Sequence, residues 1–553
     1  MPSSEVSSPN ASVDGDAAAP GASAPRRGVP GGGPRGWARA ARRRLTPENL
    51  VVLVLALLVL LVHDLGYILT QPYWTDEDWV ALTTKFPLSQ LPATTNSTPI
   101  GWSVLLRFFS VSGTQTGRLM PLAFAAAAVL VAYWFARRLD WPSREVSVGA
   151  GLLAAIAMLL VPAMLIRDDL KQYTADAFFA VVTLALTSRL ERDWSRRRLI
   201  DLSVVTWAGM LISDTVAFVG AAAFGAVCLV QLLRRDWRRL AESAVVGAVT
   251  AVLMLAVYKV FDARAVTPSL TYSPHFANYY PPLHKGKRAF LRFVYSHFQR
   301  EYTHFGLGPL WLVALLFAVG LVVIFWRGRP VTAIALAALW PEMIVISAAR
   351  LYPFIDARTS TFLFAVTAVV AAIGVAGVCS LLRPRLKGSL AVGLAVLAVA
   401  GFVVCARPFI RSHEIPNEDM KALTLYIADH ASPNDVIVLA QDSNFGFAYY
   451  WPTGQPSREA DNTIIQEYEA YFPSQPRIVV ALSRTPAGVD AAMAQALNQS
   501  RLHGCSSMWL VRTHTVPPEE GAYNTWLSQR HLSAVSQGPS GLTYIQMNKS
   551  ACE

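Results

Sequence analysis

The chain has 553 residues, of which 53% are hydrophobic and 15% are charged, and its mean hydropathy is +0.36. A soluble protein carries about 25% charged residues, so this composition excludes an ordinary soluble protein and indicates a polytopic membrane protein. The net charge of +11 does not indicate nucleic-acid binding, because the arginines occur in short clusters between apolar stretches, as in cytoplasmic loops.

Residues 1–46 are rich in Ala, Gly, Pro and Ser and end in a cluster of arginines. They lack the periodicity of a packed core, so we expect a disordered basic tail in the cytoplasm. Thr46, Pro47 and Glu48 then supply an N-cap, a proline at the first helical position and an acid in the first turn. We expect the apolar stretch that follows to be a retained first span, because no small-residue cleavage site comes after it.

Residues 47–410 contain apolar stretches of nearly spanning length. They predict about eleven transmembrane helices, at about 50–69, 118–136, 147–166, 174–190, 199–213, 215–233, 243–262, 306–326, 331–349, 359–382 and 388–408. Alternate connections carry basic clusters, which mark the cytoplasmic side. The N-terminus is therefore predicted inside, and the other connections are predicted to be outer loops of a multi-pass plasma-membrane protein. The Ala- and Arg-rich composition favours a bacterial source.

Residues 411–553 have the composition of a globular domain. Four short apolar runs predict buried strands, and two segments between them predict helices; the runs are 436–439, 478–481, 508–511 and 542–545, and the helices are 417–430 and 486–499. This alternation predicts an extracytoplasmic α/β domain. Cys505 and Cys552 could form a disulfide there.

The first predicted outer loop, residues 71–117, carries three consecutive acids, Asp76, Glu77 and Asp78, between Trp74 and Trp79. Acids are costly near a bilayer, so their position beside the first span favours a functional site. A solvated surface loop is the alternative.

The second predicted outer loop combines cations and acids in a few residues. Lys171 and Tyr173 could bind a phosphate. Asp168 and Asp169, together with Asp78 of the first loop, could hold a divalent cation such as Mg²⁺ or Mn²⁺ or contact the acceptor. A self-neutralising surface turn is the alternative.

Two further outer loops offer cations. Arg358 is the last residue of the outer loop 350–358 and could bind a phosphate with two hydrogen bonds, although an interfacial anchor has the same composition. His284 and Lys285 lie in a long loop with several aromatic residues. They could close over a lipid phosphate or a sugar, or could belong to a solvated loop. No nucleotide-binding motif is visible, so we expect no nucleotide cofactor and an activated substrate carried by a lipid.

Three motifs in this order resemble the GT-C superfamily of polyprenyl-phosphate-sugar-dependent glycosyltransferases. They are Trp74-Thr75-Asp76-Glu77 with 98–102, Leu170-Lys171-Gln172-Tyr173 with Asp176, and Tyr352-Pro353-Phe354 with Arg358. The relatives include protein O-mannosyltransferases and lipid A aminoarabinose transferases. The resemblance implies a GT-C transmembrane module and inverting transfer of a hexose or pentose to a hydroxyl in the cell envelope. The acceptor could be a glycan, a glycolipid or a protein.

The resemblance also implies roles for the loop residues. Asp76 would be the general base, and Glu77 would orient it or bind a metal. Lys171, Tyr173 and Arg358 would form the pocket for the donor phosphate. Two other classes stay open: a transporter or flippase for a lipid-linked or anionic substrate, and a membrane scaffold whose outer domain binds glycan. The charges lie at one face and no paired halves are detectable, which counts against a transporter.

Overall fold

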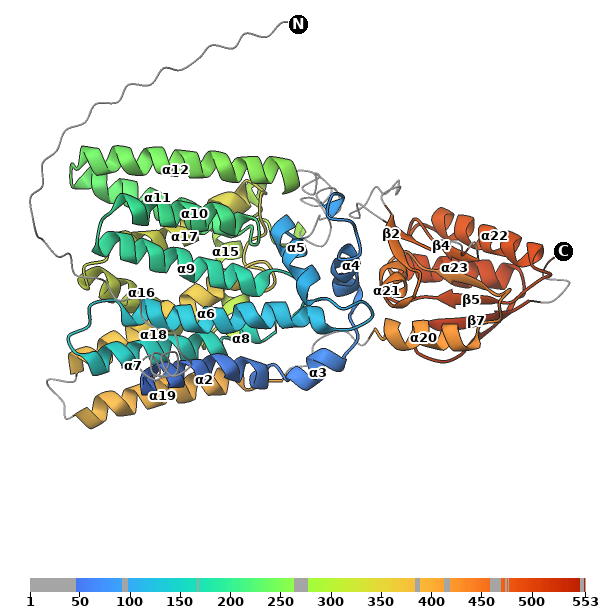
Figure 1. The fold of residues 1–553 in the computed structure, drawn as a ribbon, viewed down its shortest axis with the longest axis horizontal. Coiled ribbons are helices and arrows are strands. Elements are labelled where there is room, and N and C mark those ends of the chain that lie inside the picture. The colour runs from blue at the N-terminus through green and yellow to red at the C-terminus, as the bar shows by residue number, and fades with distance from the viewer. Residues whose placement is uncertain are drawn as a thin grey trace, which may run out of the picture. The chain divides into compact units, whose positions relative to one another are not determined.

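The computed structural model describes residues 46–91, 98–166, 169–262, 277–382, 388–411, 418–457, 469–472, 475, 477–547 and 552 (Figure 1). The predicted cytoplasmic tail lies almost entirely outside this range, as does Asp168. The described part contains a helical bundle, built from residues up to about 411, and a small sheet flanked by helices.

The bundle begins with two helices and the short helices of the first loop, α2 (Pro47–Val62), α3 (Leu65–Thr70), α4 (Thr75–Thr83), α5 (Ile100–Phe109) and η2 (Thr116–Arg118). It continues with α6 (Leu119–Arg137), α7 (Arg144–Leu160), α8 (Pro162–Leu165), α9 (Tyr173–Arg192), α10 (Arg196–Met210), α11 (Val216–Leu233), α12 (Trp237–Val257) and η3 (Tyr258–Asp262). Its last helices are η4 (Leu283–Lys285), α15 (Lys287–Phe305), α16 (Leu310–Trp326), α17 (Pro330–Ala348), α18 (Thr361–Leu382) and α19 (Gly388–Ala406).

A helix occupies every apolar stretch predicted from the sequence, so the polytopic helical fold is confirmed. Among the described residues, five helices are long and apolar enough to cross a membrane, and α15 and α16, bent by 90°, would together make a sixth. The count of eleven spans therefore stays a prediction.

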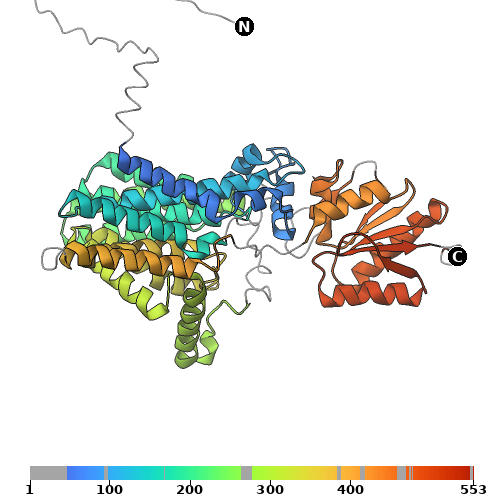
Figure 2. The ribbon, with the colours of Figure 1, turned by 90° about the horizontal axis from the view of Figure 1, so that it is seen from below.

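The most apolar helices differ in where they lie in the bundle. α18 packs against α7, α9, α16 and α19, and 89% of its most apolar window is buried (Figures 1 and 2). Gly374 of α18 permits this packing, because a Cβ at that position would collide with a carbonyl oxygen of α16. Only 6% of the corresponding window of α12 is buried. An apolar helix so exposed is suited to contact with lipid.

The C-terminal part is an α/β domain, as predicted. Its elements are α20 (Met420–His430), β1 (Val436–Leu439), α21 (Ser443–Tyr450), β2 (Gln455–Ser457), β3 (Glu469–Tyr471), β4 (Ile478–Val480), α22 (Pro486–Leu502), β5 (Met508–Val511), α23 (Pro517–Gln529), β6 (Ser533–Ser536) and β7 (Leu542–Gln546). The main sheet has the order β4-β1-β5-β7-β6, and β4, β1 and β5 are parallel. All four predicted strands belong to it. Only β6 was not expected there, because its residues are exposed and have no apolar pattern.

Alternate residues of β1 reach two different apolar cores. Val436 and Val438 pack with α22 and α23 on one face. Ile437 and Leu439 pack with α20 and α21 on the other face, and this second core also contains residues of α4 and α5. The first loop and one face of the C-terminal sheet therefore share a core.

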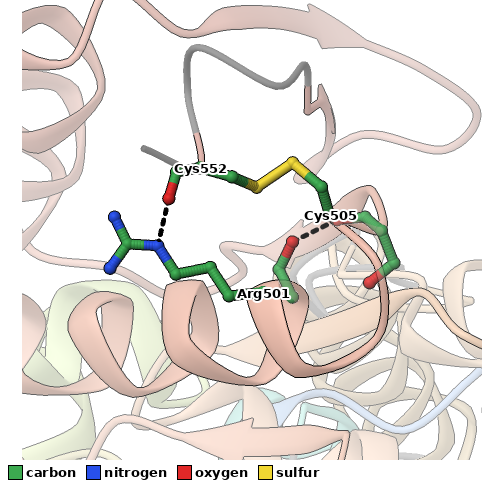
Figure 3. The surroundings of a disulfide bond; sticks show 5 residues. Arg501, Cys505 and Cys552 are labelled. Atoms are coloured by element: carbon green, nitrogen blue, oxygen red, sulfur yellow. Dashed lines mark hydrogen bonds between the residues drawn. A yellow bond between two sulfur atoms is a disulfide. The ribbon is translucent and has the colours of Figure 1, made fainter.

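Cys505 and Cys552 form a disulfide, with their Cα atoms 6.1 Å apart. Figure 3 shows that Arg501, in the last turn of α22, donates from Nε to the carbonyl oxygen of Cys552. The disulfide thus ties the C-terminal end of the described chain to α22, a pairing that the sequence left open.

Candidate active site

The three consecutive acids of the first loop lie in the first turn of α4, where negative charge is favourable beside the helix N-terminus. Successive residues of an α-helix are rotated by about 100°, so the three carboxylates diverge. Asp76, Glu77 and Asp78 consequently make three different sets of contacts.

Asp76 is the acid that meets cations from two other loops. Its Oδ2 accepts a hydrogen bond from Lys171 Nζ at 3.3 Å and forms an ion pair with Arg358 Nη2. The Asp76 side chain is 26% exposed. Three segments far apart in the sequence thus converge on one accessible carboxylate.

Aromatic rings flank both cations of this cluster. Lys171 Nζ lies 5.9 Å from the centroid of a Trp79 ring, and the Arg358 guanidinium lies 5.5 Å from that of Trp74. Both distances are within the range of cation–π attraction. The two tryptophans that flank the acids in the sequence therefore help to hold the cations beside Asp76.

Hydrogen bonds fix the two loops that carry the cations. Trp102 Nε1 of α5 donates to the carbonyl oxygen of Leu170 at 2.7 Å, which holds the residue before Lys171. Asp356 Oδ2 accepts from the backbone N–H of Arg358 at 3.2 Å, which closes a tight turn ahead of α18. Both cations are thus presented by anchored backbone.

The two cations keep Asp76 ionised. Burial opposes the charge of Asp76, but attraction and hydrogen bonding by Lys171 and Arg358 outweigh it and hold the pKa of the carboxyl well below its usual range. A carboxylate with such a low pKa is a weak base. It becomes a stronger base only when a ligand binds Lys171 and Arg358 in its place.

Glu77 points away from this cluster and is fully buried. Arg118 Nε donates to Glu77 Oε1 at 2.7 Å, Nη2 pairs with Oε2, and both side chains are 0% exposed. Arg118 also donates to the carbonyl oxygens of Ile68, Gln71 and Pro72. This contact set joins α4 to the end of α3. Glu77 pairs with Arg118, and its predicted role beside Asp76 stays a prediction.

Asp78 faces α21 of the C-terminal domain. It is fully buried, and neither carboxylate oxygen has a hydrogen-bond partner among the described residues. A Cβ at Gly446 of α21 would collide with Asp78 Oδ2, so glycine allows the close approach of α21 to this acid. Burial raises the pKa of Asp78 well above its usual range, and the charge of Glu77 adds to the shift. Asp78 therefore lies in a helix interface and not with Asp76.

The remaining predicted site residues are distributed around the cluster. Tyr173 and Asp169 are buried, and both lie within electrostatic range of Arg358. His284 and Lys285 are exposed on η4, and no described contact brings them to Asp76. Asp168 lies outside the described residues. The roles predicted for these residues stay predictions.

The part of the chain that the structure describes contains no group of three or more His, Cys, Asp or Glu side chains that could hold a metal ion. Asp76 and Glu77 each lie against arginine or lysine, surroundings that disfavour another cation. Asp168, one of the predicted ligands, lies outside the described residues, so the Mg²⁺ or Mn²⁺ ion that the sequence suggests stays a prediction.

An apolar cavity of about 750 Å³ lies between α10, α11, α12 and α17. Its walls include Phe218, Ala221, Phe224, Met254, Leu255 and Tyr352. The Tyr352 hydroxyl donates to the carbonyl oxygen of Thr359 at 2.8 Å. Because Thr359 follows Arg358, this bond connects the cavity wall to the loop that supplies a cation to Asp76.

Three polar residues around the first turn of α4 were not singled out from the sequence. Arg118 looked like the first residue of a span, yet it binds Glu77. Glu418 Oε2 accepts from Thr75 N at 3.3 Å and from Thr75 Oγ1 at 2.8 Å, and Glu418 Oε1 accepts from His514 Nδ1 at 2.7 Å. The only sequence signal for Glu418 and His514 was their place in a domain predicted on the same side as Asp76.

Comparisons with protein-family models and with curated protein sequences find no match. Solved structures do match. ArnT from Cupriavidus metallidurans in the apo state aligns with a TM-score of 0.54 at 14% identity, over 92% of this chain and 99% of ArnT. The same protein bound to undecaprenyl phosphate aligns with a TM-score of 0.52 at 12% identity, over 93% and 98%. This chain has the GT-C fold.

A second protein with the GT-C fold supports this result. The Archaeoglobus fulgidus oligosaccharyltransferase, in complex with Zn and sulfate, aligns with a TM-score of 0.51 at 13% identity, over 90% of this chain and 73% of the oligosaccharyltransferase. The alignment with ArnT spans nearly all of both chains, so the GT-C likeness includes the C-terminal domain as well as the bundle. The fold expected from the three sequence motifs is confirmed.

Proposed function

We propose that the protein is a glycosyltransferase that moves a sugar from a polyprenyl-phosphate donor to an acceptor hydroxyl outside the cytoplasm, with inversion at the anomeric carbon. The observation that carries this proposal is the cluster of Asp76, Lys171 and Arg358. Two anchored cations suit a phosphate, and an accessible carboxylate beside them suits the proton of a hydroxyl.

The donor phosphate would exchange partners with Asp76. In the described state Lys171 and Arg358 both bind Asp76 Oδ2. A phosphate that takes over these cations frees the carboxylate and raises its pKa toward the ordinary range. Donor binding thereby turns a weakly basic, paired carboxylate into an available base.

The apolar cavity suits the lipid part of such a donor. Most of its lining is apolar, although Asp214, Thr206 and Thr250 also line it, and Tyr352 joins its wall to the Arg358 loop. ArnT, which has the same fold, has been solved bound to undecaprenyl phosphate. These two observations support a polyprenyl phosphate as the carrier of the sugar.

The transfer would be a single displacement. The acceptor oxygen forms a bond to the anomeric carbon as the bond between that carbon and the phosphate oxygen breaks. The hydroxyl proton moves to Asp76, and the bonding electron pair leaves with the polyprenyl phosphate. Lys171 and Arg358 stabilise the second negative charge of that leaving group. Attack from the face opposite the phosphate inverts the anomeric carbon.

The disulfide supports an extracytoplasmic site. Disulfides such as Cys505–Cys552 persist in oxidising compartments and are rare in the cytoplasm. The alternating basic loops of the sequence predict the same side for the C-terminal domain. Since this domain shares a core with α4, Asp76 would lie on that side too.

The test is transfer of radiolabelled sugar from a panel of synthetic polyprenyl-phosphate sugars to a membrane extract by the purified full chain. Asp76→Asn is expected to lower the rate about 10²–10⁴-fold. Asp429→Asn is the matched control, because Asp429 is an exposed acid of the C-terminal domain. Full activity of Asp76→Asn would remove Asp76 from the role of base. No transfer from any donor by the folded wild type would contradict the function itself.

A further inference from the structure

The parallel strands of the C-terminal domain end at one edge of the sheet. β1 pairs with β4 on one side and with β5 on the other. The strand order therefore changes direction at β1, because the next two parallel strands lie on opposite sides of it. In open α/β sheets such a switch point, at the carboxyl ends of the strands, is where ligands bind. Asp442, Arg484 and His514 lie in the segments that follow β1, β4 and β5 respectively.

The polar groups at this edge are held in place. Arg484 forms an ion pair with Asp442. Ser443 Oγ donates to the carbonyl oxygen of Thr513 at 3.0 Å and accepts from its backbone N–H at 2.9 Å. The segments after β1 and β5 are thus bound to each other at Thr513, the residue before His514.

His514 combines exposure, strain and a specific partner. Its φ is 57°, a left-handed conformation that costs a non-glycine residue free energy and is concentrated at functional sites. Its side chain is 38% exposed, and Nδ1 donates to Glu418 Oε1 at 2.7 Å. Glu418 therefore orients a ring that is partly exposed at the surface.

The same glutamate connects this edge to the proposed catalytic residue. Glu418 Oε2 accepts from the backbone N–H and the hydroxyl of Thr75, the residue before Asp76. The hydrogen bond to Glu418 is the main reason that the pKa of His514 is raised, and burial opposes this shift. The negative charge of Asp76 raises the pKa further. The sheet edge therefore lies beside the Asp76 cluster.

We infer that this edge, centred on His514 and Arg484, binds a neutral, hydroxyl-rich glycan as the acceptor, and that Glu418 positions His514. The assignment as acceptor site rests on the proposed transferase function. Arg484 is paired with Asp442 and His514 with Glu418, so these two pairs leave no excess positive charge to attract an anion. It does present donors and acceptors side by side, and every sugar hydroxyl can both donate and accept.

The test measures binding without turnover. Saturation-transfer difference NMR would be recorded on the full chain in nanodiscs, with neutral gluco-, manno-, galacto- and arabino-oligosaccharides and their phosphorylated forms as probes. His514→Asn removes the imidazole but keeps a residue that tolerates left-handed backbone. His531→Asn is the matched control, because His531 is also exposed and has a φ of 49°.

Wild type is expected to bind at least one neutral oligosaccharide, and His514→Asn is expected to weaken binding about tenfold or more. His531→Asn should bind like wild type. Glu418→Gln, which releases the ring without removing it, should weaken binding to a lesser degree. Absence of neutral-glycan binding, a preference for the phosphorylated probes, or unchanged binding by His514→Asn would each overturn the inference. Because no donor is present, a protein that binds glycan but transfers no sugar would contradict only the proposed function.

Discussion

The adjacent acids Asp76 and Glu77 are expected to respond in opposite ways to the same conservative change. Asp76→Asn removes a charge from an accessible cluster, and Glu77→Gln removes one from a fully buried ion pair. We expect the first variant to be folded and inactive. We expect the second to lose stability, and to lose activity only as far as folded protein is lost.

The magnitude for Glu77→Gln follows from its burial. Both side chains of the pair are 0% exposed, and Arg118 would keep its charge in the interior but lose the carboxylate that its Nε and Nη2 bind. Removing one partner of a buried pair costs about 3–5 kcal/mol. That free energy lowers the ratio of folded to unfolded protein by roughly 10²–10⁴-fold. The carbonyl contacts of Arg118 with residues of α3 would remain, so the lower half of this range is the better expectation.

The assay compares stability and specific activity for each variant in the same detergent. Thermal unfolding followed by tryptophan fluorescence reports the stability, and sugar transfer per folded molecule reports the chemistry. A Glu77→Gln protein with wild-type stability and a rate reduced 10²-fold or more would refute this reasoning, because it would assign Glu77 to the reaction. A destabilised Asp76→Asn protein would likewise contradict the description of Asp76 as an accessible, functional carboxylate.

Three further changes test other parts of the structure. Arg358→Lys keeps the charge but loses the paired N–H groups of the guanidinium. The KM for the polyprenyl-phosphate sugar should therefore rise about tenfold, while the KM for the acceptor is unchanged. An unchanged KM for the polyprenyl-phosphate sugar would argue against a phosphate ligand at Arg358. The raised pKa of Asp78 means that the folded chain keeps this proton to a higher pH than the unfolded chain does. Stability should therefore fall as the pH rises from about 4 toward the raised pKa, and Asp78→Asn should flatten that dependence in thermal unfolding between pH 4 and 8. Cys505→Ser opens a loop whose ends are 47 residues apart. Denaturant titration should show a free energy of unfolding about 4 kcal/mol lower than that of the oxidised wild type. Equal stability of the two proteins would show that the disulfide does not constrain the unfolded chain.

Much of the fold could be predicted because its signals are local. Long apolar stretches predict helices whatever their partners are, and the four buried strands are short apolar runs with flanking polar residues. The meeting of Asp76, Lys171 and Arg358 could also be anticipated in part. Alternating basic loops assign all three residues to the same side of the membrane, although they do not say which of the many polar residues on that side come together.

The divergence of the three acids could not be predicted from composition. The sequence presents Asp76, Glu77 and Asp78 as one cluster, and the separation arises only because α4 rotates each residue onto a different face. The partners of the second and third acids are a buried arginine at the start of α6 and a glycine of α21. Such pairings depend on tertiary packing between distant segments. Glu418 and Thr75 are likewise 343 residues apart, with no shared pattern in the sequence.

The sequence predicts a domain boundary near residue 410, and the contacts of α4 cross that boundary. Glu418 binds the N-terminus of α4 through Thr75. Just beyond the C-terminal end of α4, Lys85 Nζ donates to the carbonyl oxygens of Ala448, Tyr449 and Gly454 at 2.8–3.1 Å. The helix that carries Asp76 is thus held at both ends by the C-terminal domain and shares its core. The position of the proposed base therefore depends on both modules, and a glycan bound at the edge of the sheet, as we infer, would lie beside a residue of the bundle.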